Sequence, residues 1–485
     1  MTQDARRFAA IVAAVAVATV CSALMTGVGV AVAGAQARTT VRADSGGTWD
    51  TAQEVPGTAA LNTGGFAVTR SVSCASVGDC SAGGFYTETS GNHQAFVVGE
   101  ANGTWGTATE IASGVNTGGF AVTESVSCNL AGTCGAGGFY TDGSGHQQAF
   151  VVGETNGTWS TVREVPGSAK LNQGGSAQIT SVSCTSAGNC SAGGSYRDSS
   201  SHSQAFVVGE TNGTWGTAQE IAAGLNQGGD ALTTSVSCAS AGNCSAGGLY
   251  RDGLAHFQAF VVGETNGTWG TVQEVPGTAA LNRGGSAQIT SVSCAAMGNC
   301  SAGGNYLDGF NHFQAFVVNE KNGTWSIAKR VAAALNQGGH ALINSVSCAS
   351  AGNCGAGGFY TDGSGHSQAF VVGEITGTWG IAKRVAAALN QGGHALINSV
   401  SCASAGNCSA GGLYTDGAGR FQAFVVGETS GTWGTAEELP GTAALNQGVR
   451  AAVAWVSCAA AGHCSAGGFY TDRAGHQQAY VDSET

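Results

Sequence analysis

Proline and charged residues are both scarce in this chain. Proline occurs only 4 times in 485 residues, which argues against an array of proline-rich linkers. Charged residues make up 10% of the chain, and acidic residues outnumber basic ones by 30 to 18 with no basic stripe. This balance argues against a nucleic-acid partner and against an anionic membrane surface. The hydrophobic share of 42% is too high for a disordered chain.

Long apolar runs are absent except near the start. Arg6 and Arg7 precede a stretch of apolar and small residues over 8–33, and Ala35-Gln36-Ala37 then forms a small-x-small cleavage site. This pattern predicts a signal peptide at 1–37 and a short linker at 38–46, so that the mature protein is extracellular and free of the membrane. The length of the run leaves a retained membrane anchor as the alternative.

The cysteines fit export. One of the 17, Cys21, lies in the predicted signal, and the remaining ones form eight pairs with five residues between the two members. Disulfides are typical of a secreted chain, whereas a zinc site brings four ligands together and no histidine accompanies these pairs in a repeated way. We therefore predict eight local disulfides and no metal site. The pairs are Cys74/Cys80, Cys128/Cys134, Cys184/Cys190, Cys238/Cys244, Cys294/Cys300, Cys348/Cys354, Cys402/Cys408 and Cys458/Cys464.

A tryptophan recurs every 54 or 56 residues and marks an internal repeat. In the clearest copy, strand-forming residues lie at 345–348, 354–360 and 368–372, and a fourth strand begins near Trp379. An Asn-Gly pair between the third and fourth strands, such as Asn156-Gly157, is typical of a tight hairpin. Each unit therefore predicts four short strands. The tryptophans are Trp49, Trp105, Trp159, Trp215, Trp269, Trp325, Trp379 and Trp433.

The phase of the repeat predicts a ring. A lone fourth strand lies at 47–55, and the unit that reaches 485 has only three strands. The early strand can complete that last unit, which leaves no sheet edge unpaired. Four strands in a repeat of this length match a propeller blade. We predict an all-β fold over 47–485, an eight-bladed β-propeller closed by the N-terminal strand with one disulfide per blade.

Two stretches of each unit carry a family resemblance. The Thr-Asn-Gly-Thr-Trp stretch, as at 155–159, resembles a degenerate form of the Asp-box of sialidase-type propellers, with Asn in place of Asp. The longer pattern His-x-Gln-Ala-Phe-Val-Val followed by Asn-Gly-Thr-Trp resembles secreted bacterial β-propeller repeats of largely unassigned function, over 47–485. The resemblance implies the fold and is not specific for any activity.

Alternating strand directions sort the loops onto two faces. The turn between the second and third strands shares one face with the long connection to the next unit, and the disulfide hairpins and Asn-Gly turns, which offer little to a ligand, share the other. Loops carry most binding residues, so we place candidate sites on the first face. The candidate ligand-binding residues there are Asp142, His146, Asp198, His202, Asp252, His256, Asp308, His312, Asp362, His366, Asp472 and His476.

A structural role is the alternative for these repeated polar residues. The aspartates can cap turns, and the repeated Asn, Gln and Tyr, such as Asn390, Gln368 and Tyr360, can satisfy groups within or between blades. Six histidines around a ring are too far apart to share one metal ion. The repeated tryptophan is expected to pack between blades, with stacking on a sugar ring as the alternative.

Repetition and missing motifs favour a binding protein over an enzyme. The chain has no nucleophile elbow, phosphate loop or zinc-protease motif, so we expect no catalytic residues and no cofactor. Departures from the repeat, such as Asp230, Arg450 and Trp455, fall on different units and give no acid/base arrangement. We predict multivalent recognition of an extracellular carbohydrate (a glycan) or of a cell-surface polymer. A surface scaffold and a glycan-active enzyme, either a glycosidase or a lyase, are the alternatives.

Overall fold

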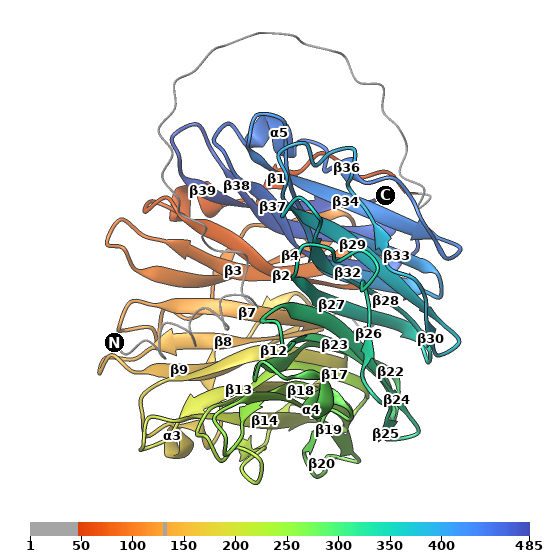
Figure 1. Ribbon diagram of the computed structural model, residues 1–485. Coiled ribbons are helices and arrows are strands. Elements are labelled where there is room, and N and C mark those ends of the chain that lie inside the picture. The colour runs from red at the N-terminus through yellow and green to blue at the C-terminus, as the bar shows by residue number, and fades with distance from the viewer. Residues whose placement is uncertain (1–46, 130–132) are drawn as a thin grey trace.

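The computed structural model describes residues 47–129 and 133–485. Eight antiparallel sheets follow one another around a ring, and the first and last sheets lie side by side (Figure 1). The sheets are numbered here from sheet 1, which begins with β2, to sheet 8, which begins with β37. The predicted signal peptide and linker lie outside the described residues. No helix in the described part of the chain is long and apolar enough to cross a membrane.

Each sheet has an inner strand, two long middle strands and a short outer strand. The inner strands are β2 (Ala67–Ser76), β7 (Ala121–Cys128), β12 (Ala177–Ser186), β17 (Ala231–Ser240), β22 (Ala287–Ala296), β27 (Ala341–Ser350), β32 (Ala395–Ser404) and β37 (Ala451–Ala460). The second strands are β3 (Asp79–Thr87), β8 (Cys134–Thr141), β13 (Asn189–Arg197), β18 (Asn243–Arg251), β23 (Asn299–Leu307), β28 (Asn353–Thr361), β33 (Asn407–Thr415) and β38 (His463–Thr471). The third strands are β4 (His93–Ala101), β9 (Gln147–Thr155), β14 (Ser203–Thr211), β19 (Phe257–Thr265), β24 (Phe313–Lys321), β29 (Ser367–Ile375), β34 (Phe421–Thr429) and β39 (Gln477–Ser483).

The outer strand is split into two pieces in sheets 1 to 7. In sheet 1, Trp105 is opposite Glu100 and Thr109 is opposite Val97, so the outer strand carries one extra residue and bulges between the pieces. The pieces are β5 (Thr104–Trp105), β6 (Thr109–Glu110), β10 (Thr158–Trp159), β11 (Arg163–Glu164), β15 (Thr214–Trp215), β16 (Gln219–Glu220), β20 (Thr268–Trp269), β21 (Gln273–Glu274), β25 (Thr324–Trp325), β26 (Lys329–Arg330), β30 (Thr378–Trp379), β31 (Lys383–Arg384), β35 (Thr432–Trp433) and β36 (Glu437–Glu438). Short helices lie in four of the long connections, namely α2 (Thr58–Leu61), α3 (Ser168–Leu171), α4 (Thr278–Leu281) and α5 (Thr442–Leu445).

The core lies in the contacts between neighbouring sheets, which we call seams. In the seam between sheets 5 and 6, Ala315 and Val317 of β24 pack with Ile343, Val346 and Phe370 of sheet 6. Third strands are apolar on both faces because each sheet is covered on both sides. A Cβ atom on Gly83 would lie 2.6 Å from Thr123 of the next sheet, so glycine is needed where the sheets approach most closely.

The ring is closed as the sequence predicts. The early strand β1 (Gln53–Glu54) pairs with β39 and completes sheet 8. A serine on every inner strand accepts a hydrogen bond from the backbone N–H of the first cysteine of the next sheet. The series returns to its origin where Cys74 donates to Ser457 Oγ at 3.0 Å. Sheet 8 is therefore joined to sheet 1 by the same bond that joins the other sheets.

The eight predicted disulfides are present, and each joins the inner and second strands of one sheet. They indicate an oxidising compartment. The bonds link Cys74 with Cys80, Cys128 with Cys134, Cys184 with Cys190, Cys238 with Cys244, Cys294 with Cys300, Cys348 with Cys354, Cys402 with Cys408 and Cys458 with Cys464.

The disulfides lie where the sequence predicts, between the first and second strands of each blade, and the structure adds that the second cysteine of each pair is buried. Cys184 and Cys190 are directly opposite each other in the strand ladder, so the bond lies within the sheet and not in the turn. Cys190 is consequently buried in the seam with Val182. Cys300 is buried in the same way, and its Sγ lies 3.3 Å from Ser245 Oγ of the preceding sheet. The buried second cysteines are Cys80, Cys134, Cys190, Cys244, Cys300, Cys354, Cys408 and Cys464.

Candidate functional site

The predicted aspartates cap the turns between second and third strands. Asp362 Oδ1 accepts hydrogen bonds from the backbone N–H groups of Ser364 and His366, at 2.9 and 3.0 Å. Its Oδ2 accepts a hydrogen bond from Gln368 Nε2 at 2.7 Å. Burial acts to raise the pKa of the Asp362 carboxyl, but these hydrogen bonds outweigh it and leave the pKa below its usual range. The same three bonds form at Asp142, Asp198, Asp252, Asp308, Asp416 and Asp472.

The hydrogen-bonded chain continues from each aspartate into the next sheet. Gln368 Oε1 accepts from Asn390 Nδ2 at 3.0 Å, and Asn390 lies in the connection to sheet 7. An Asn–Gln pair of this kind forms at all eight seams. The structural interpretation of the repeated Asn and Gln is therefore confirmed, and turn capping by the aspartates is confirmed with it.

The predicted histidines lie against the neighbouring sheet. A Cβ atom on Gly393 would lie 2.9 Å from His366 Cδ2, so the imidazole packs on this glycine of the next connection. The imidazoles of His202, His256 and His476 are 55, 49 and 56% exposed, and each Nδ1 lies 3.7–4.0 Å from the aspartate of its own turn. Glycine contacts of the same kind hold His146, His202, His256, His312 and His476.

The other repeated aromatic residues have structural roles. Trp379 is 4% exposed and belongs to the core of its seam, which confirms packing rather than sugar stacking. Tyr196 donates a hydrogen bond to Glu220 at 2.8 Å.

Among the described residues, three or more metal-ligating side chains come together only at Cys128, Cys134 and Glu154, and at Cys238, Cys244 and Glu264. The sulfur atoms of both groups are joined in disulfides, so neither group is a metal centre.

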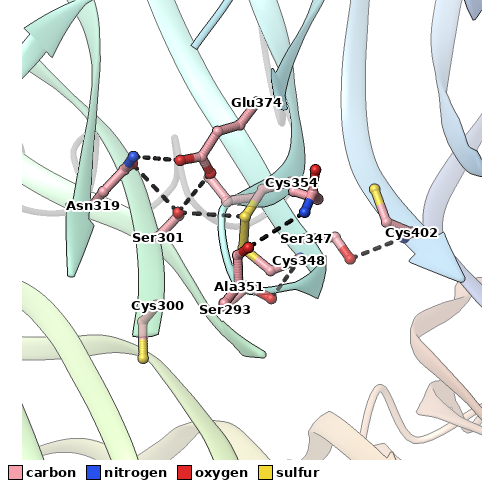
Figure 2. Close-up of a disulfide and its surroundings, with 12 residues drawn as sticks. Ser293, Cys300, Ser301, Asn319, Ser347, Cys348, Ala351, Cys354, Glu374 and Cys402 are labelled. Carbon is pink, nitrogen blue, oxygen red and sulfur yellow. Dashed lines mark hydrogen bonds between the residues drawn. A yellow bond between two sulfur atoms is a disulfide. The ribbon is translucent and has the colours of Figure 1, made fainter. Parts of the chain in front are cut away.

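A carboxylate that was not predicted from the sequence lies beside each disulfide, and it is buried at every sheet except at Glu210, where it is half-buried. Figure 2 shows Glu374 next to the Cys348–Cys354 disulfide, facing Ser301 and Asn319 of the preceding sheet. Ser301 Oγ donates to Glu374 Oε2 at 3.0 Å and lies 3.4 Å from Cys354 Sγ. Burial raises the pKa of this carboxyl. A glutamate at this place recurs as Glu100, Glu154, Glu210, Glu264, Glu320, Glu374, Glu428 and Glu484, and this repetition was the signal available in the sequence.

The disulfide face, which was expected from the sequence to offer little to a ligand, carries two hollows. A hollow of about 310 Å³ opens between sheets 6 and 7. It is lined by Glu374, Glu428 and Trp433, and by one cysteine of each neighbouring disulfide, Cys354 and Cys408. A second hollow of about 200 Å³ lies between sheets 8 and 1, at Glu100 and His463. Both lie at the ends of third strands, on the face opposite the predicted Asp and His residues.

No known protein family and no curated protein match this sequence. Among solved structures, an ulvan lyase of polysaccharide lyase family PL25 is similar with a TM-score of 0.43 and 10% identity, over 75% of this chain and 90% of that one. The Hadza microbial sialidase Hz136 has a TM-score of 0.35 and 11% identity, over 81% and 73%. The fucose-specific lectin from Aleuria aurantia has a TM-score of 0.31 and 12% identity, over 65% and 94%. At such low identities the similarity concerns the fold alone.

Proposed function

We propose that this protein is a secreted, multivalent binder of an extracellular carbohydrate or cell-surface polymer. The observation that carries the proposal is the repeated pair of a partly exposed imidazole and a turn-capping carboxylate, as in His476 and Asp472. Each imidazole is held between its own turn and a glycine of the next sheet, so little conformational freedom is lost when it donates or accepts a hydrogen bond.

Repetition is what makes such pairs useful. One imidazole and one carboxylate form a weak site for sugar hydroxyls, but several on one rigid ring raise avidity by about 10²–10⁴ for a polymer that spans them. The net charge of −12 favours a neutral polymer over a polyanion. The eight disulfides and the pattern at 1–37 support secretion.

The test replaces the imidazole without disturbing its turn. Sheet 1 carries Asn92 where six other sheets carry histidine, and Asn92 packs on Gly119 in the same way, so His366→Asn and His146→Asn are compatible with the fold. On a glycan array, we expect each single variant to weaken binding and the double variant to weaken it further, with an unchanged Tm. Asp362→Ala, which removes three hydrogen bonds from the turn, lowers the Tm as the contrasting control.

Two results would redirect the assignment. If the wild-type protein retains no glycan and the histidine variants only lower the Tm, the Asp and His side chains are structural and the protein is a surface scaffold. If a polysaccharide is cleaved, and cleavage is lost on changing Asp230 or Arg450, the protein is an enzyme with a single site.

A further inference from the structure

A Trp–Glu pair recurs on the disulfide face of each sheet. The outer-strand tryptophan is paired in register with the glutamate of the third strand, as Trp379 with Glu374 and Trp433 with Glu428. One residue of the preceding sheet faces this pair, the residue just before that sheet's own glutamate. It is Asn319 for the first pair and Gly373 for the second.

Two seams bridge the pair with a side chain of the preceding sheet. Asn319 donates from Nδ2 to Glu374 and accepts at Oδ1 from Trp379 Nε1, at 2.6 Å for the latter bond. At the seam between sheets 8 and 1, a hydroxyl forms the same two hydrogen bonds. Ser483 Oγ accepts from Trp105 Nε1 at 3.2 Å and donates to Glu100 at 2.7 Å. A group that both donates and accepts therefore satisfies the pair, whether it is a hydroxyl or a carboxamide.

The other six seams have glycine in this place and no such bridge within the described residues, and among these six the seam between sheets 6 and 7 has a hollow at the pair. Gly373 stands in the place of Asn319, and a Cβ atom there would lie 3.6 Å from Glu428 Oε1. Trp433 Nε1 is buried and has no hydrogen-bond acceptor among the described residues. The place of Ser301 is taken by Gly355, and Glu428 accepts no hydrogen bond within the described part of the chain. Trp433 and Glu428 are each only 6% exposed.

The indole N–H of Trp433 is buried without a partner among the described residues, which costs free energy, and the Glu428 carboxylate beside it is free to accept a hydrogen bond from an occupant of the hollow. They line the hollow of about 310 Å³, whose size falls within the range of small-molecule sites. Ile375 and Ile381 at its rim are 62 and 91% exposed and offer apolar contact. Lys383 also lines it, but its Nζ already donates to the Trp433 carbonyl at 3.0 Å.

We propose that this hollow is a binding site for a sugar, whose hydroxyl takes the place that Ser483 fills at the ring closure. The hydroxyl oxygen accepts a hydrogen bond from Trp433 Nε1, and the hydroxyl group donates a hydrogen bond to the Glu428 carboxylate. The isoleucine side chains contact the apolar C–H surface of the ring. This site lies on the face opposite the imidazole–carboxylate pairs, and it does not depend on the function proposed above.

The test fills the hollow from within the protein. Gly373→Asn recreates the Asn319 bridge, and Trp433→Phe removes the indole N–H, which makes no hydrogen bond among the described residues, together with the pyrrole part of the ring. Binding of the methyl glycosides of glucose, galactose, mannose and N-acetylglucosamine is followed by saturation-transfer NMR and calorimetry. We expect one of these sugars to bind, and each variant to weaken its binding at least tenfold. Gly373→Asn should do so without lowering the Tm, whereas Trp433→Phe, which truncates a core side chain, should lower it as well.

The control repeats the substitution at a seam whose glutamate already accepts a hydrogen bond. Gly263→Asn faces Glu320, which accepts a hydrogen bond from Ser245, and we expect it to leave sugar binding unchanged. Acetamide and glycerol are tested as ligands alongside the sugars. Acetamide tests whether any carboxamide binds, and glycerol tests whether any simple hydroxyl compound binds. If no sugar binds while Gly373→Asn raises the Tm, the pair is bridged by water and the proposal is wrong. Sugar binding that survives both Gly373→Asn and Trp433→Phe would equally overturn it, whatever happens to the histidine variants.

Discussion

The seam between sheets 8 and 1 differs from the other seven in how its inner strands are joined. In those seven, a serine such as Ser71 accepts from a backbone N–H of the next inner strand, at 3.0 Å to Val126 in this case. Trp455 takes the place of this serine in sheet 8 and is 43% exposed. Ala454 stands beside it where Asn398 donates to the next inner strand at 2.7 Å.

The outer strand of sheet 8 is held by the same backbone bonds as in the other sheets, where for example Gly106 donates to the Gly99 carbonyl at 2.8 Å. Thr48 and Thr485 exchange backbone hydrogen bonds of 2.8 and 3.0 Å, and Asp50 donates to the Ser483 carbonyl at 2.9 Å. Sheet 8 is thus completed by a segment that comes from the opposite end of the described chain. The difference teaches that the inner contacts at one seam can be reduced while the outer strand of the sheet stays complete.

The largest expected effect comes from removing this outer closure. A shortened chain that begins at Pro56 lacks β1 and the buried side chains of Trp49, Ala52 and Val55, so β39 becomes an open edge. We expect a loss of more than about 5 kcal/mol of stability together with aggregation. Size-exclusion chromatography and thermal unfolding check this. A monomer that melts like the chain beginning at Gly47 would show that the inner contacts alone close the ring.

A buried acid next to the closing strand gives the second effect. Asp482 is 2% exposed, its Oδ2 has no hydrogen-bond partner among the described residues, and burial raises its pKa to about 9. The unfolded chain ionises this carboxyl near pH 4 while the folded chain keeps it protonated, so stability falls as pH rises from about 4 to about 9. The other seven sheets carry valine here, such as Val426.

Asp482→Val should therefore remove a penalty on the order of 4 kcal/mol at pH 7 and flatten the pH dependence of stability. Denaturant unfolding of both proteins between pH 4 and 9 measures the difference. The buried glutamates remain in both proteins and cancel in the comparison. Parallel stability curves for the two proteins would mean that Asp482 finds a partner or water in solution.

Disulfides test whether sheet 8 is weaker throughout or only at its inner strand. The backbone bond from Cys74 to Ser457 is the same as in other seams, so the disulfide region of sheet 8 is ordinary. Replacing Cys458 and Cys464 with alanine should cost about 2 kcal/mol, as should the same change at Cys238 and Cys244. A clearly larger loss in sheet 8, measured by chemical denaturation, would place the weakness in the whole sheet.

The sequence predicts what lies within one repeat far better than what lies between two. The Trp and Cys spacing, the Asn-Gly turns and the strand at 47–55 all predicted the ring, because each depends on local or repeated signals. The Asp cap was also visible as an alternative. The Asn319–Glu374 contact was not, because it joins side chains 55 residues apart across a seam. The change of valine to Asp482 is visible in the sequence, but its burial depends on which face of β39 packs on sheet 7.

The smallest effect comes from restoring the missing serine. Trp455→Ser should provide a hydroxyl to the backbone N–H of Val72, as Ser399 does for Val456 at 3.1 Å in the neighbouring seam. The new hydrogen bond should contribute about 1 kcal/mol, from which the contacts of the partly buried indole must be subtracted. The reverse change, Ser399→Trp, should destabilise an ordinary seam. A rise in Tm for the first variant and a fall for the second would show that the serine hydrogen bond stabilises a seam more than the indole does. If Trp455→Ser instead lowers the Tm, the indole itself stabilises the seam.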